Sequence, residues 1–245
     1  MNLKRIVGLF LLAGSLLGGD ELSGEVIERA EYQLRWGLFS VGTVVMEMRE
    51  GGEPGEEVYF MRAETNSWMD RFLKARTMIW STYDREAERS LHFRREERDK
   101  PVPDVNEAKF DWETGTVRFV KNGEVRLPVG IREGTQDPLS VVFAARREKL
   151  AAGRTFTLPV TDGKTFAVAD FRVRDGGKRA NGTGDRVETF EVVVDMKDVR
   201  GVFARPDGAL IRVWVEQEPP HLPVRLKSEI VLGSFVAEIR ARADR

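Results

Sequence analysis

Apolar and polar residues alternate along most of the chain from Arg29 onward, and turn-forming residues interrupt the alternation at short intervals. Tyr32, Leu34 and Trp36 are separated by single polar residues, so an extended backbone would place all three on one face. A period of two that is broken by frequent turns is typical of antiparallel β-sheet. The pattern therefore predicts a mainly β protein.

Three turns in the second half of the sequence mark predicted hairpins. Asn122-Gly123 separates two alternating runs, and these two residue types tolerate the positive φ angles that a two-residue hairpin turn requires. The segments 161–163 (Thr-Asp-Gly) and 206–208 (Pro-Asp-Gly) predict two further turns. We expect the last strand to cover residues 235–241.

One segment has the pattern of a helix rather than of a strand. Asp137 precedes it and can cap the free amide groups of the first turn, where Pro138 is also well tolerated. The apolar positions fall near one stripe of a helical surface: Leu139, Val142, Phe143 and Leu150. Basic residues near the end of the segment complement the helix dipole, and Gly153 can terminate the helix. We expect a single α-helix near residues 138–150 that covers one face of the sheet.

The first residues follow a different pattern, which indicates export. Two basic residues precede an apolar run from Ile6 to Leu17, and small residues and a charged segment follow. This order is typical of a secretory signal peptide. The run has about a dozen residues, whereas a membrane-spanning helix needs roughly 20, so an uncleaved anchor is the weaker interpretation. We expect a signal peptide at residues 1–24, whose cleavage site the sequence leaves open, and one β-rich domain at residues 25–245.

Composition and net charge exclude several classes of function. The chain has no cysteine, which excludes disulfides, cysteine nucleophiles and thiolate metal sites. Its 39 basic and 40 acidic residues give a net charge of −1, so nothing favours nucleic acid as a partner. No glycine-rich phosphate-binding pattern occurs, and we expect no cofactor. We expect an exported, periplasmic protein that touches the membrane only through the signal segment if that segment stays uncleaved.

No group of residues in the sequence has the pattern of a catalytic or metal site. The two histidines, His92 and His221, lie far apart, and we interpret the first as a surface residue of a strand and the second as part of a turn. Ser140 and Ser228 lack the glycine-flanked turn that activates a nucleophilic serine. We therefore predict no catalytic residues and no metal ligands, in a protein that is not an enzyme.

Glycines and tryptophans in the predicted strands point to a ligand instead. Three glycines sit where bulges or bends would let a sheet curve: Gly37, Gly42 and Gly233. A curved sheet with a helix over it can enclose an apolar cavity, and ligand sites are commonly apolar with few polar groups. We take three tryptophans as candidate ligand-binding residues, with ordinary core packing as the alternative for each: Trp36, Trp80 and Trp214.

Several short segments carry a family resemblance through their order and spacing. They are Tyr32-x-x-x-Trp36-Gly37, Ile79-Trp80-Ser81-Thr82-Tyr83-Asp84, Asp137-Pro138-Leu139-Ser140, Asp162-Gly163-Lys164, Ile211-Arg212-Val213-Trp214-Val215 and Leu222-Pro223-Val224-Arg225. Together they resemble an exported bacterial family known as domain of unknown function 3108 (DUF3108). The resemblance implies a strongly curved antiparallel sheet, a half-barrel similar to lipoprotein carriers. It supplies no catalytic residues to carry over.

These inferences favour a non-catalytic protein of the cell envelope that binds a lipid or another apolar or amphiphilic ligand in the concavity of the sheet. A second interpretation is an envelope scaffolding module that binds a protein partner, because an exposed strand edge can pair with another chain. A third is a hydrolase of envelope polymers. That function predicts two carboxyl groups that face each other across a cleft, roughly 5 to 9 Å apart.

Overall fold

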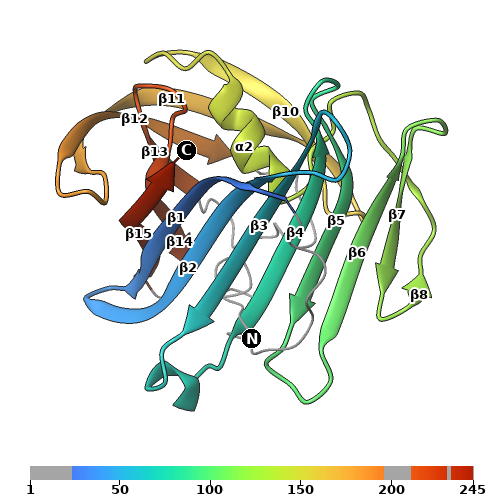
Figure 1. Ribbon diagram of the computed structural model, residues 1–245, viewed down its shortest axis with the longest axis horizontal. Helices are drawn as coiled ribbons and strands as arrows, with labels where there is room; N and C mark the ends of the chain where they lie inside the picture. Colours follow the sequence, from blue (N-terminus) through green and yellow to red (C-terminus); the bar gives the residue numbers. More distant parts are fainter. Residues whose placement is uncertain (1–23, 196–210, 231–232, 245) are drawn as a thin grey trace.

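The computed structural model describes residues 24–195, 211–230 and 233–244, and most of their regular structure is β-strand (Figure 1). Most of the predicted signal segment and the predicted turn at 206–208 lie outside the described residues. The first half of the chain contributes β1 (Val26–Trp36), β2 (Phe39–Glu50), β3 (Glu56–Thr65), β4 (Arg76–Asp84), β5 (Arg89–Glu97), β6 (Asp104–Asp111), β7 (Thr116–Lys121), β8 (Glu124–Val125) and β9 (Val129–Gly130). The second half contributes β10 (Thr155–Thr161), β11 (Phe166–Ala180), β12 (Arg186–Asp195), β13 (Ile211–Glu216), β14 (Pro223–Ile230) and β15 (Gly233–Asp244). A short 3-10 helix, η1 (Met69–Arg71), and the α-helix α2 (Ser140–Arg147) complete the described elements.

These strands form one antiparallel sheet that curls into a half-barrel (Figure 1). The strand order is β10-β11-β12-β13-β14-β15-β1-β2-β3-β4-β5-β6-β7-β8, and β9 also pairs with β7. Nearly every strand lies beside its neighbours in sequence. Besides the short β9, the exception is the pairing of β15 with β1, which joins the two halves of the chain at the middle of the sheet.

The two ends of the half-barrel differ. The helix α2 and the turns that follow β2 and β4 lie at one end, at the top of Figure 1, which we call the helix end. The turn between β1 and β2, the η1 helix and the loop between β5 and β6 lie at the other, which we call the loop end. The helix therefore covers only one end of the concave side.

The two edges of the sheet approach each other without pairing between strands in the part of the chain that the structure describes. Gln136, just before α2, forms a parallel bridge with Val160 of β10. The Gln136 Nε2 also donates to the carbonyl of Glu88, beside β5, at 2.7 Å. Farther along the same edge, a Cβ added at Gly163 would lie 2.9 Å from the Ala108 side chain of β6. The hairpin of β10 and β11 thus folds over β5 and β6.

Three clusters of buried side chains fill the concave side. The first lies on β1, β2, β3 and β13 to β15 and includes Tyr32 and Leu34. The second lies on β10 to β13 and includes Val141 of α2, and the third lies on β3 to β7 and includes Phe143 of α2. Because α2 contributes to two clusters, it connects the two sides of the curved sheet.

The predicted fold class is confirmed: the protein is mainly β, with a large, curved, open antiparallel sheet and one covering α-helix. The helix is shorter than the predicted 138–150, because the backbone returns to an extended conformation at Glu148, with ψ 148°. Among the described residues, no helix has the length and apolar character of a membrane span.

The predicted hairpin turns that fall within the described ranges are also confirmed. Asn122 and Gly123 have φ angles of 49° and 86° and connect β7 to β8. The turn at 161–163 connects β10 to β11. The last strand extends beyond the predicted 235–241 at both ends, because its pairing with β1 and β14 continues there.

Gly42 is required by a close approach between β2 and β3, and its replacement by alanine is expected to destabilise the fold. An added Cβ would lie 2.1 Å from the backbone oxygen of Glu64. Since a backbone atom of a paired strand cannot move aside cheaply, we expect Gly42→Ala to lower the free energy of unfolding by about 1 to 3 kcal/mol. Urea denaturation measures this loss. Gly52→Ala is the control, because open space surrounds Gly52, and an equal loss in both variants would contradict the prediction.

Candidate functional site

A partly exposed apolar surface lies on the concave face where the three buried clusters meet. Four half-buried side chains form it: Met46, Met61, Val142 and Leu226. Met46 and Met61 pack against the first and third clusters, and Leu226 packs against the first and second. Val142 approaches from α2 and packs against the second and third. We call these four side chains the inner apolar surface.

Strand alternation places the two methionines on this face. Met46 and Met61 are register partners on β2 and β3. The next residue of β2, Glu47, points to the convex face and pairs there with Arg49 at 2.7 Å. Successive side chains of a strand point to opposite faces, so β2 presents methionine inward and charge outward. The unbranched, flexible thioether side chains suit an apolar surface that must adapt its shape.

Trp36, the first predicted ligand-binding residue, lies at the loop end of this concave face. It is half-buried and packs against the first cluster. Its ring stacks on Phe235 with centroids 6.3 Å apart and an interplanar angle of 26°. Trp36 thus borders the cluster that Met46 and Met61 also contact.

Trp80 lies on the opposite, convex face of the sheet. It alternates along β4 with Ile79, which belongs to the third cluster beneath α2. The Trp80 ring lies 5.6 Å from that of Phe60, and the Arg94 guanidinium lies 5.9 Å from its centroid. Trp80 is therefore separated by the sheet itself from the inner apolar surface.

Trp214 is buried and covered by cations. It belongs to the first cluster and is 7% exposed. The guanidinium groups of Arg179 and Arg225 lie 4.4 and 5.4 Å from its ring centroid. The structure thus brings Trp36 and Trp214 to one cluster and leaves Trp80 apart. Trp214 is the register partner of Arg225, however, so it faces away from the side of the sheet on which Leu226 lies. The residues of the inner apolar surface were missed as candidates; alternation marks Met46 as facing one side, but the sequence does not show which side is concave.

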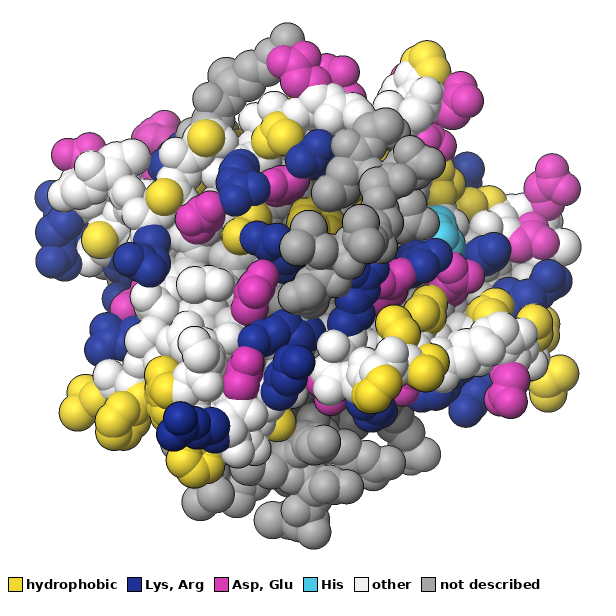
Figure 2. All heavy atoms as spheres, turned by 60° about the horizontal axis from the view of Figure 1, so that its bottom comes forward, with side chains coloured by type: hydrophobic (Ala, Val, Ile, Leu, Met, Phe, Trp, Pro, Cys, Tyr) yellow, Lys and Arg dark blue, Asp and Glu magenta, His cyan; other side chains and the backbone are white. Residues whose placement is uncertain are grey.

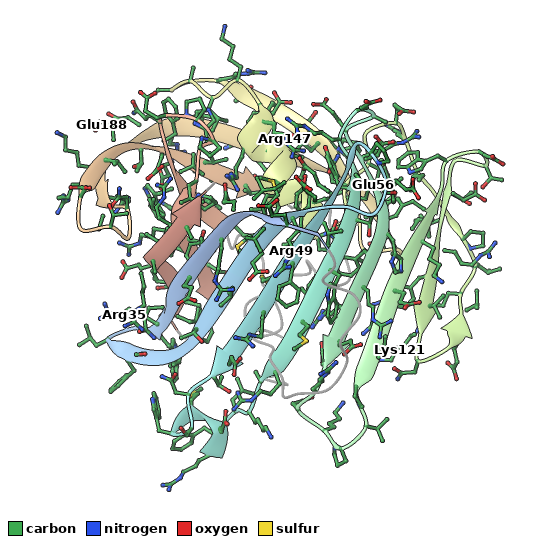
Figure 3. All side chains as sticks on the ribbon, in the orientation of Figure 1. Arg35, Arg49, Glu56, Lys121, Arg147 and Glu188 are labelled. Atoms are coloured by element: carbon green, nitrogen blue, oxygen red, sulfur yellow. The ribbon has the colours of Figure 1, made fainter. Side chains whose placement is uncertain are left out.

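Towards β7 the concave face changes from apolar to charged. Arg95 of β5 is the register partner of Ile79, which places it on the inner face, and it pairs with Glu97. Lys121 of β7, labelled in Figure 3, is the second cation of this region. Its ammonium lies 3.0 Å from the Asp104 carboxylate of β6. We call these four charged side chains the inner charged strip.

A fifth charged residue approaches this strip from the hairpin of β10 and β11. The Lys164 ammonium lies 4.3 Å from the ring centroid of Phe119. Burial lowers the pKa of Lys164, the nearby Asp162 carboxylate opposes this shift, and the positive charges of Arg95, Arg126 and Lys121 act in the same direction as burial. An anionic group placed among these cations would relieve their mutual repulsion.

Two arginines fix the helix to the sheet. Arg146 forms a bidentate ion pair with Glu28 of β1, at 2.8 and 2.5 Å, and its Nε donates to the Pro220 carbonyl at 3.1 Å. Arg147, which is labelled in Figure 3, lies at the helix end. It pairs with Glu57 of β3. The hydroxyl of Tyr59 donates to the same carboxylate at 2.7 Å, and burial raises the pKa of this tyrosine above its usual range.

Asp137 caps the start of the helix and links it to strands β4 and β5 through hydrogen bonds. Its Oδ1 accepts hydrogen bonds from the amides of Leu139 and Ser140, at 2.8 and 2.9 Å, as the capping prediction requires. Its Oδ2 accepts one from the Ser81 hydroxyl of β4. Its amide donates to the Ser90 hydroxyl of β5 at 2.8 Å. Burial raises the pKa of this carboxyl, although these donors oppose the shift.

The histidines lie on a strand and in a turn, as expected, but His92 is half-buried and not a fully exposed surface residue. His92 is a register partner of Thr82 and lies on the convex face of β5. His221 lies in the turn after β13 with a φ of 57°, and its Nδ1 is 2.9 Å from the Glu216 carbonyl oxygen. Within the described ranges, no three His, Asp or Glu side chains are grouped so as to hold a metal ion.

Comparison with known proteins places this arrangement in a family. Residues 31–240 match the family described as "Protein of unknown function (DUF3108)". No curated protein matches the chain. The crystal structure of a β-barrel-like protein of domain of unknown function DUF1849 from Brucella abortus is similar, with a TM-score of 0.55 and 13% sequence identity. The match covers 89% of this chain and 97% of that one, and it shows the fold.

Proposed function

The chain belongs to the DUF3108 family, and on that premise we propose that it is a non-catalytic protein of the cell envelope that binds an apolar or amphiphilic ligand. The observation that carries this proposal is the inner apolar surface. Four apolar side chains on the concave face, each between two buried clusters, stay half-exposed. The signal-peptide pattern of residues 1–24 supports export to the periplasm.

The chemistry of the concave face favours an amphiphile over a purely apolar ligand. The inner apolar surface would contact a hydrocarbon chain, and the flexible side chains of Met46 and Met61 can adapt to different chains. The inner charged strip, with Lys164 beside it, would contact a polar or anionic headgroup. Ligand sites commonly combine an apolar lining with a few polar groups that fix orientation.

The buried carboxylates of the concave side already have partners. Glu28 and Glu57 are paired with the helix arginines, and Asp137 accepts hydrogen bonds from the first turn of the helix. These roles hold the helix on the sheet. A structural role for these carboxylates supports a binding function, in which the helix and the sheet keep a fixed relative position around the ligand.

Exchange of the two methionines for glutamine tests the proposal. Met46→Gln with Met61→Gln keeps side-chain length but makes the inner apolar surface polar. We expect the affinity for a fluorescent fatty-acid probe to fall roughly tenfold, because about 1 to 2 kcal/mol of apolar contact is lost. Probe titration measures the dissociation constant.

Met78→Gln is the matched control for this titration. Met78 is also half-buried, but it lies on the convex face of β4, as the register partner of Arg62 and Glu96. The control should bind the probe like the unchanged chain. If the unchanged chain binds no apolar probe, ligand binding is wrong, and the envelope scaffolding function becomes the better explanation.

A further inference from the structure

Four large apolar side chains are exposed together at the loop end. They come from the turn between β1 and β2 and from the segment around η1: Leu38, Phe39, Trp68 and Phe72, which are 87%, 65%, 44% and 79% exposed. We call them the tip surface. Figure 2 shows hydrophobic atoms gathered at the lower left, over the turn of β1 and β2 and the η1 segment. Exposed apolar groups that gather in one place commonly mark an interaction site.

Local hydrogen bonds hold the two loops of the tip surface together. Gly37 adopts a φ of 56°, which allows the tight turn that projects Leu38 outward. The Nε1 of Trp68 donates to the Ser40 carbonyl at 3.0 Å, and the Asn66 amide donates to the same oxygen at 2.9 Å. The tip surface is therefore held in a defined conformation. The polar Nε1 of Trp68 is hydrogen-bonded within the protein.

Its three aromatic rings form a row across both loops. The ring centroids of Phe39 and Trp68 lie 6.2 Å apart, and those of Trp68 and Phe72 lie 6.4 Å apart. Beneath them, Met69 and Leu73 of the same segment are buried in the first cluster. The row is thus fixed on a rigid base and presents its outer edges to the surroundings.

The exposed charged residues of the two loops themselves are positive. Arg71 and Lys74 are exposed on the η1 segment. Asp70 is the sole acidic residue of segments 37–40 and 66–75, and it is engaged by the Thr65 hydroxyl and by Arg76. An approaching surface therefore meets apolar rings flanked by cations, without a competing exposed carboxylate from these two loops.

We propose that the tip surface inserts into the interface of an anionic lipid bilayer. Tryptophan and phenylalanine rings are favoured at the boundary between headgroups and hydrocarbon, and leucine adds apolar area. Flanking lysine and arginine residues are attracted to anionic headgroups. Trp36, in the same hairpin as Leu38, borders the concave face, so a docked protein would hold that face near the membrane. The docking does not depend on ligand binding by the inner apolar surface.

Vesicle partitioning of the full chain tests the inference. The probes are vesicles of phosphatidylcholine with phosphatidylglycerol, and vesicles of phosphatidylcholine alone. We expect Leu38→Ser with Phe72→Ser to lower the partition coefficient at least tenfold. Arg71→Gln with Lys74→Gln should lower binding to the anionic vesicles about fivefold per charge removed and leave binding to neutral vesicles unchanged. The apolar run at residues 6–17 is present in every variant and adds an equal background.

Val125→Ser with Leu127→Ser is the matched control. These residues are 62% and 89% exposed, but they lie at one edge of the sheet, beyond β7, whereas the tip surface lies on strands in the middle of the sheet. We expect them to leave partitioning unchanged. Equal loss in both double variants, or no loss in either, would overturn the proposal. So would self-association that Leu38→Ser with Phe72→Ser abolishes without vesicle binding, which would assign the tip surface to a second copy of the chain.

Tryptophan quenching supplies a readout at the tip surface itself. Brominated lipids quench a tryptophan that enters the bilayer interface. We expect quenching in the unchanged chain and its loss in Trp68→Phe. Trp112→Phe is the control, because Trp112 lies at the helix end, where its Nε1 donates to the Ser90 carbonyl at 2.9 Å. Undiminished quenching in Trp68→Phe would show that another part of the chain enters the bilayer.

Discussion

Replacement of Arg146 by alanine is expected to lower the free energy of unfolding by about 3 to 5 kcal/mol. The Arg146 side chain is 6% exposed and the Glu28 side chain 8%, so removal of one partner leaves the other charge buried and unpaired. Glu28→Gln should have a similar effect for the same reason. Urea denaturation followed by tryptophan fluorescence measures both losses.

A double variant distinguishes two causes of the stability loss: an unpaired buried charge, and the loss of the packing of the two side chains. Arg146→Met with Glu28→Leu removes both charges and retains apolar volume, so it should be less destabilised than either single change. The exposed pair of Lys178 and Glu188 is the control: its side chains are 64% and 52% exposed, and Lys178→Met should cost less than about 1 kcal/mol. Single variants near the stability of the unchanged chain would show that the helix is not held by this pair.

Asp137→Ala is the second large effect, with an expected loss of about 3 kcal/mol. The change leaves the Ser81 hydroxyl and the amides of Leu139 and Ser140 without their acceptor in a buried environment. It also removes the cap of the helix that joins two of the three clusters. Thermal and urea denaturation should both report the loss, and an unchanged midpoint would contradict it.

Asp137→Asn tests the protonation state of the same group. Burial raises the pKa of Asp137, so the folded chain binds this proton more tightly than the unfolded chain does. The resulting stability is fully present below the unfolded pKa of about 3.9 and is lost as the pH rises through the folded value. Compared with Asp137→Asn, which does not titrate, the unchanged chain should therefore lose stability as the pH rises above about 4. A difference independent of pH would contradict this.

The two arginines of the helix show why the contacts that hold the helix on the sheet could not be predicted from the sequence. Basic residues near a helix end suit the helix dipole, and this local interaction was the explanation that the sequence supplied for Arg146 and Arg147. Arg146 is instead buried against Glu28, 118 positions earlier in the chain. Nothing in local patterning links two charges at that separation; the curl of the sheet brings them together.

The tryptophans show that even within one strand the sequence does not reveal which face of the sheet is concave. Alternation places Trp80 on one face of β4 and Ile79 on the other, and the sequence alone is enough to predict this. Which face becomes concave depends on where α2 packs, and α2 packs on the side of Ile79. Met46 and Met61 therefore border the candidate site, whereas Trp80 lies behind the sheet.

By itself, the sequence determined the local elements of this protein: the strands, the turns at Asn122-Gly123 and 161–163, and a helix that starts after Asp137. These depend on backbone preferences and on periods of a few residues, which short segments contain in full. The tertiary structure decided which face is concave, how the edges overlap and which charges are buried. These depend on contacts between distant segments, whose pairing is settled by the packing of the whole sheet around one helix.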